Sequence, residues 1–102
     1  MCMATFAIRV SDGVKDDMRR LRAYDRRMLL EAIETLTHEP MIATKQRKLL
    51  RHLIPPFEAI PPIWQLRVGV FRIFYDVDEA SRCVYVRAIR KKPAHLRTEE
   101  IL

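Results

Sequence analysis

The sequence predicts a single α+β domain spanning residues 1–102, in which an N-terminal strand and a helical hairpin precede an antiparallel three-strand meander, with the helices on one face of the sheet. Three observations support this fold class. A short alternating segment comes first, two segments with helical periodicity follow, and three closely spaced alternating segments come near the end. Helices and strands grouped in this way along a chain are typical of α+β domains. A length of 102 residues fits one such domain with a single core.

The N-terminal part predicts a strand followed by a helical hairpin. Residues 5–10 alternate apolar and polar side chains, which is the pattern of a short strand. Apolar residues then recur at intervals of four and three, at Val14, Met18 and Leu21. The helical spacing returns over residues 26–36, and Pro40 ends this second helix because the residue before a proline avoids helical geometry.

Residues 39–62 predict a long loop, since they lack periodicity and contain five of the six prolines. Within this loop we expect one or two helical turns over residues 44–53. Residues 63–68, 70–77 and 82–89 then alternate with short links between them, which predicts an antiparallel three-strand meander. A final helical turn is expected within residues 96–102.

The charge is concentrated in one part of the chain. The whole net charge of +6 lies in residues 41–102, and residues 1–40 are balanced. This bias indicates a polyanionic partner, of which nucleic acid is the commonest, although a solvated basic surface explains it equally well. No apolar run is long enough for a membrane span, residues 1–10 lack the layout of a signal peptide, and two cysteines do not suggest a disulfide framework. We therefore expect a cytoplasmic protein with no membrane partner.

Three arginines fall opposite the more apolar face of the predicted meander: Arg67, Arg72 and Arg87. Like charges on neighbouring strands repel, so such a cluster is a poor way to build a surface and a good way to hold phosphates through two-pronged hydrogen bonds. In the alternative interpretation each arginine extends to solvent and has Asp76 or Glu58 as its neighbour.

Two further basic segments flank this cluster, Lys45 to Arg51 and Arg90-Lys91-Lys92, and each is as compatible with a solvated surface as with a binding site. The three histidines lack the short spacing of zinc ligands, and two glycines are too few for a phosphate-binding loop. We therefore expect neither a metal nor a cofactor.

The segment WQLRVGVFRIFYDV, residues 64–77, resembles the central signature of the RelE/ParE toxin superfamily. In that signature an aromatic residue precedes Leu-Arg-Val-Gly, and an aromatic residue, Arg, two apolar residues and Tyr follow. Residues 84–92 are similar to the next strand, which ends in a basic pair. The predicted order of elements also matches the family fold, so the resemblance covers essentially the whole chain.

The resemblance implies the toxin of a toxin–antitoxin system, neutralised by a cognate antitoxin. RelE-like members cut mRNA on the ribosome without a metal and so inhibit translation. Their basic residues orient the 2′-OH, stabilise charge on the phosphate and protonate the leaving oxygen. ParE-like members instead inhibit DNA gyrase. We expect the RelE-like activity, a ribosome-dependent mRNA endonuclease, with gyrase inhibition or an inactive relative that only binds its antitoxin as the alternatives.

The resemblance also implies roles for individual residues. The catalytic positions are Arg67, Arg72 and Lys92, and His95 is the nearest replacement for a C-terminal Tyr of many RelE-like nucleases, which this tail lacks. Arg72 matches the arginine that contacts the scissile phosphate. The expected RNA-binding residues are Lys45, Lys48, Arg51, Arg87, Arg90 and Lys91.

Overall fold

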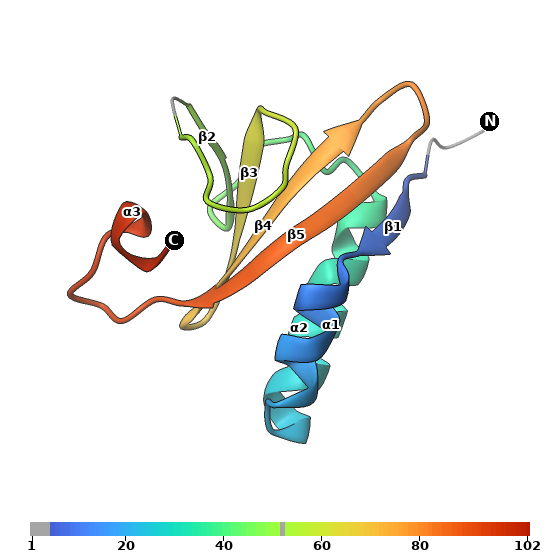
Figure 1. Ribbon diagram of the computed structural model, residues 1–102. Helices are drawn as coiled ribbons and strands as arrows, with labels where there is room; N and C mark the ends of the chain where they lie inside the picture. The colour runs from blue at the N-terminus through green and yellow to red at the C-terminus, as the bar shows by residue number, and fades with distance from the viewer. Residues whose placement is uncertain (1–4, 52) are drawn as a thin grey trace.

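The computed structural model describes residues 5–51 and 53–102 and has a mixed sheet of five strands with three α-helices (Figure 1). The elements in chain order are β1 (Ala7–Val10), α1 (Asp12–Arg19), α2 (Ala23–Glu34), a 3₁₀ turn (Thr35–Thr37), β2 (Arg47–Leu50), β3 (Ile63–Val68), β4 (Phe71–Asp78), β5 (Cys83–Lys91) and α3 (Thr98–Ile101). The strand order is β1-β5-β4-β3-β2, in which β1 is parallel to β5 and all other neighbours are antiparallel. The predicted α+β fold is confirmed.

The predicted helical hairpin is formed by α1 and α2. Ser11 caps α1, because its hydroxyl accepts the backbone N–H of Val14 at 3.3 Å. Arg26 closes the link between the two helices by donating to the carbonyls of Met18 and Leu21, at 3.0 and 2.9 Å. The Arg26 guanidinium is therefore used to satisfy carbonyl groups at the end of α1.

The sheet has an apolar core on each face. Figure 1 shows α1 and α2 on one side of the sheet and α3 on the other. The main core lies between the hairpin and the sheet and includes Leu29, Leu36 and Tyr75, all fully buried. A smaller second core lies on the opposite face and consists of Ile63, Phe74 and Ala88, together with Leu50, Leu53, Phe57, Ala59, Ile101 and Leu102 packed against them. The second core fixes the tail and the loop after β2 to the face that carries the predicted arginines.

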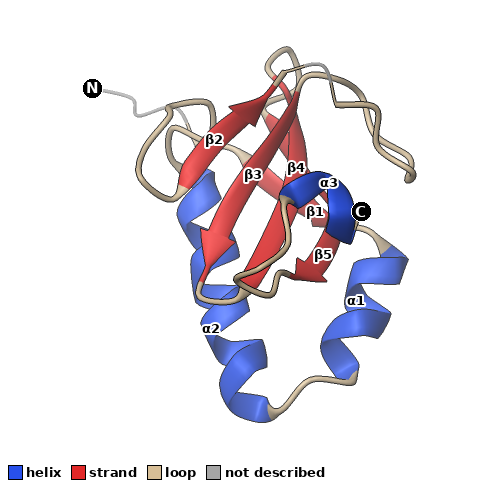
Figure 2. Cartoon of the chain, turned by 90° about the vertical axis from the view of Figure 1, so that its left-hand side faces the viewer, coloured by secondary structure: helices blue, strands red, loops and turns tan. Residues whose placement is uncertain are grey.

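The helical turns expected over residues 44–53 are wrong, because residues 47–50 form the edge strand β2 beside β3 (Figure 2). The sequence RKLL carries no strong preference by itself, whereas the outer edge of β3 offers backbone hydrogen bonds. Leu49 packs on the main core and Leu50 on the second core, as alternation along a strand requires. The predicted meander of three strands is thus extended to four by β2.

Candidate functional site

Three arginines form a row across the sheet face that lies away from the α1–α2 hairpin. Arg67 of β3 lies opposite Arg72 of β4, and Arg72 lies opposite Arg90 of β5. Directly opposed residues on antiparallel strands have Cβ atoms about 5 Å apart, and like charges at that separation destabilise the sheet. A bound anion would relieve this repulsion.

Arg72 is held in place by the turn between β3 and β4. Its Nη1 donates to the carbonyls of Gly69 and Phe71, both at 2.9 Å. Gly69 has a φ of +58°, a backbone conformation that glycine adopts without strain. Burial, and secondly the charge of Arg67, lower the pKa of Arg72, which means that its charged form is poorly compensated in the free protein. The Nε and Nη2 donors remain for a ligand.

Two arginines of this row, Arg67 and Arg72, line a small cavity of about 230 Å³. Five residues with cationic side chains line this cavity in all. Its lining comes from the segment before β2, from β2, β3 and β4, from the residue that follows β5, and from α3. It consists of Lys45, Gln46, Lys48, Gln65, Arg67, Arg72, Lys92 and Thr98. The backbone N–H of Lys92 donates to the carbonyl of Val70 at 2.6 Å, which ties the end of β5 to the β3–β4 turn. Elements distant in sequence therefore meet at one basic hollow.

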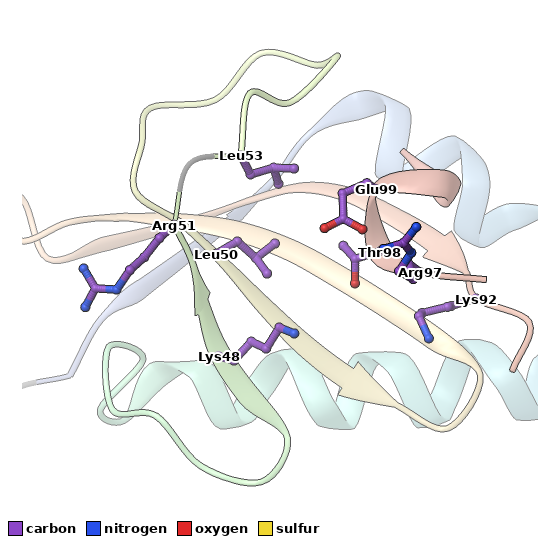
Figure 3. A pocket seen from close by; sticks show the side chains of 8 residues that line it. All are labelled: Lys48, Leu50, Arg51, Leu53, Lys92, Arg97, Thr98 and Glu99. Carbon is purple, nitrogen blue, oxygen red and sulfur yellow. The ribbon is translucent and has the colours of Figure 1, made fainter. Parts of the chain in front are cut away.

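A second cavity of about 460 Å³ adjoins the first and shares three of its residues (Figure 3). It is lined by Lys48, Leu50, Arg51, Leu53, Lys92, Arg97, Thr98 and Glu99. The hydroxyl of Thr98 donates to the side-chain oxygen of Gln65 at 2.9 Å and so links α3 to β3. In Figure 3 the carboxylate of Glu99 points into the cavity, whereas the guanidinium of Arg51 points away from it.

The cations of the small cavity have no carboxylate partner in the part of the chain that the structure describes. The ion pairs formed there join Arg19 to Asp16, Arg22 to Asp25, Arg97 to Glu100 and Arg87 to Asp76. Five uncompensated positive charges around one hollow make a strong local field for an anion such as an RNA phosphate.

Arg87 lines neither of these two cavities and is paired with Asp76 instead. The register of β4 and β5 shifts between Phe74 and Tyr75, and Arg87 is left without a partner in the strand pairing. Its guanidinium donates to the two oxygens of Asp76 at 2.7 and 3.2 Å, and this hydrogen bonding, despite burial, raises the pKa of Arg87. The structure therefore matches the alternative interpretation at this position, in which Asp76 is the neighbour.

The remaining predicted residues lie around the cavity rather than in it. Arg90 donates to the carbonyl of Ile89, and its guanidinium carbon lies 5.9 Å from the ring centre of Phe57. Lys91 and His95 are exposed and line neither cavity.

Sequence reasoning missed five lining residues with polar side chains: Gln46, Gln65, Arg97, Thr98 and Glu99. The only signal for Gln65 was its place beside Arg67 on the same face of a strand, two residues before it. Within residues 5–51 and 53–102, no three His, Cys, Asp or Glu side chains gather as a metal site would require. None of the helices described is long and apolar enough to cross a membrane.

Comparison with known proteins gives a family match and several similar structures. Residues 8–92 match the model of the family described as the ParE toxin of the type II toxin–antitoxin system parDE. The fold is similar to the RelBE2 toxin–antitoxin complex of Mycobacterium tuberculosis, with a TM-score of 0.69, 18% identity and coverage of 86% of this chain and 99% of that one.

Two further solved structures share this fold. The archaeal RelE–RelB complex from Pyrococcus horikoshii OT3 has a TM-score of 0.70, 18% identity and coverage of 90% and 99% of the two chains. The isolated RelE toxin of E. coli has a TM-score of 0.57, 19% identity and coverage of 93% and 89%. No curated protein sequence matches the chain.

Proposed function

The chain belongs to the ParE toxin family of type II toxin–antitoxin systems, and on this premise we propose that it is a ribosome-dependent mRNA endonuclease that inhibits translation. The observation that carries the proposal is the basic cavity, where Lys45, Lys48, Arg67, Arg72 and Lys92 converge without carboxylate partners among the described residues. An inhibitor that acted only by binding gyrase would have no need of such a cavity.

The chemistry proposed is a transfer of the phosphate within the RNA chain. The 2′ oxygen of a ribose forms a bond to the adjacent phosphorus, the bond from phosphorus to the 5′ oxygen breaks, and a proton passes to that oxygen. In this proposal Arg67 and Arg72 hold the scissile phosphate and the negative charge that develops on it, and each such donor contributes about 10²–10³ in rate. Lys45 and Lys48 would bind the flanking phosphates.

The residues that line the two cavities support a dependence on the ribosome. Neither cavity is lined by an aromatic side chain. Stacking on aromatic rings is the usual way for a protein to hold unpaired bases, so this chain by itself orients RNA poorly. A messenger already positioned in the decoding site would bring the 2′-OH and the phosphate into line, and such orientation supplies a large share of the rate.

The experiment that tests this function is induction of the chain alone in a bacterium, followed by mapping of mRNA 5′ ends within minutes. New ends at codon-spaced positions in translated messages are expected for the wild type. Arg72→Ala should reduce them by about 10²–10³. The matched control is Arg9→Ala, an exposed arginine on the edge strand farthest from β2, which should cleave like the wild type. A folded Arg72→Ala protein with full cleavage would contradict the proposal.

A second candidate function is inhibition of DNA gyrase, and the family match to the ParE toxin is the observation that favours it. This function predicts a DNA damage response with intact messages, loss of supercoiling by purified gyrase, and full toxicity of Arg72→Ala. Absence of any growth arrest would instead indicate a relative that only binds its antitoxin.

We propose that the partner of this protein is a cognate antitoxin. We also propose that the protein meets this antitoxin and its target in the cytoplasm. Two of the similar structures are complexes of a RelE toxin with its antitoxin. The net charge of +6 and the uncompensated cavity favour an antitoxin segment that is acidic or amphipathic and that orders on binding.

A further inference from the structure

The small cavity supplies positive charge but no carboxylate. In their charged forms, lysine and arginine side chains are donors only. The oxygen of Gln65 already accepts the hydroxyl of Thr98 at 2.9 Å. Attack by a ribose 2′-OH requires that its proton be removed, and a lysine can take this proton only after it has lost its own, so a carboxylate near the phosphate would serve the proposed reaction better.

We propose that Glu99 is the general base of this site, a role that rests on the proposed endonuclease function. Among the described residues it is the one carboxylate that lines either cavity, and it shares the larger cavity with Lys48 and Lys92, which also line the smaller one. Figure 3 shows its two oxygens directed into this space.

The carboxylate that caps the start of α3 belongs to Glu100 and not to Glu99. An oxygen of Glu100 accepts the backbone N–H of Arg97 at 3.1 Å and lies 3.5 Å from the Nε of the same residue. No hydrogen bond or ion pair involves the Glu99 carboxylate within the described ranges. A carboxylate at this place also repels phosphate and so weakens RNA binding, which argues against a role in affinity.

The position of Glu99 is set by contacts on both sides of it. Thr98 is tied to Gln65 of β3, and Ile101 and Leu102 pack on the second core. These contacts hold α3 against the sheet, so the carboxylate faces the larger cavity, which Lys48 and Lys92 also line.

In the step that we assign to Glu99, its carboxylate takes the proton of the 2′-OH as the bond from oxygen to phosphorus forms. The bond from phosphorus to the 5′ oxygen breaks, and the Lys92 ammonium gives a proton to the leaving oxygen. The products are a 2′,3′-cyclic phosphate and a 5′-OH end. Exchange with water then restores both side chains.

The test makes two measurements on ribosomes programmed with an mRNA. The first is the rate of single-turnover cleavage of that mRNA. The second is the affinity of the protein for the same ribosomes when the mRNA carries a 2′-O-methyl group at the scissile nucleotide, which prevents cleavage. Glu99→Gln should lower the cleavage rate about 10²-fold or more, the usual contribution of a general base. Its affinity should be unchanged or higher, because a negative charge is removed. Sodium formate should partly restore cleavage by Glu99→Ala. Glu100→Gln is the matched control and should cleave within about threefold of the wild type, since glutamine can still accept the backbone N–H of Arg97 and residue 100 lines neither cavity.

Three outcomes would overturn the assignment. Cleavage by Glu99→Gln within about threefold of the wild type would remove Glu99 from the chemistry and leave the endonuclease function standing. Equal losses of cleavage and affinity would show a role in folding or binding instead of proton transfer. A wild-type protein that binds the ribosome without cutting the message would overturn the proposed function, and the role of Glu99 with it.

Discussion

Breaking the ion pair between Asp76 and Arg87 tests whether this arginine stabilises the fold or is available to bind RNA. The side chain of Asp76 is 3% exposed and that of Arg87 is 16% exposed. Asp76 also accepts the backbone N–H of Ile60 at 3.1 Å, so one carboxylate fixes both the guanidinium and the loop before β3. Asp76→Asn keeps the shape of the side chain and removes its charge.

The expected loss of stability in Asp76→Asn is about 3 kcal/mol, because removing one partner of a buried pair costs about 3–5 kcal/mol and Arg87 keeps some contact with water. In a domain of this size that loss corresponds to a fall of about 10–20 °C in melting temperature. Urea denaturation of the purified toxin, followed by circular dichroism, measures the free energy of unfolding directly.

Two controls make this measurement specific. Asp16→Asn breaks the exposed pair with Arg19 and should change stability by less than about 0.5 kcal/mol. Arg87→Met combined with Asp76→Asn should cost less than the two single changes added together, since the double variant leaves no unpaired charge. A loss below about 1 kcal/mol in Asp76→Asn would refute the reasoning and return Arg87 to the set of residues available for RNA.

Three other outcomes are expected from the same structure. Tyr75→Phe removes the hydrogen bond that the hydroxyl donates to Pro40 at 2.6 Å, and it should cost about 1–2 kcal/mol in urea denaturation. Burial raises the pKa of Tyr75, so the folded state keeps its proton above pH 10 while the unfolded chain loses it; stability should therefore fall above about pH 10 in the wild type and less in the variant. Lys45→Ala should weaken binding of a fluorescent single-stranded RNA and reduce the slope of log affinity against log salt by about 0.7, and an unchanged slope would place Lys45 outside the RNA interface.

Local patterns were sufficient where one face of an element packs on the core. The alternation in residues 63–68 and the helical spacing at Val14 and Met18 both reflect burial against the main core, and both elements form as predicted. The same alternation places Arg67 and Arg72 on one sheet face, and they are directly opposed across β3 and β4.

Features of the structure that depend on contacts between residues distant in sequence could not be predicted from local patterns. Residues 47–50 become a strand because β3 offers them an edge, and nothing within the segment records this. The shift in register beside Arg87 has no local signal in the sequence either. The alternation of side chains along β5 therefore could not show that Arg87 pairs with Asp76. The place of the tail depends on a distant contact, the bond from Thr98 to Gln65.

The second core explains why the cations and the carboxylate come together. Clustered like charges oppose folding, and the burial of Phe74 and Ile63 on the same sheet face offsets that cost a short distance away. The same core takes Ile101 and Leu102 from the tail, and Thr98 and Glu99, which lie three and two residues before Ile101, line the cavity. Packing of the tail on this core is therefore what brings the carboxylate to the cavity: a tail that left the sheet would remove Glu99 from it, whereas Arg67 and Arg72 would stay fixed by the strands.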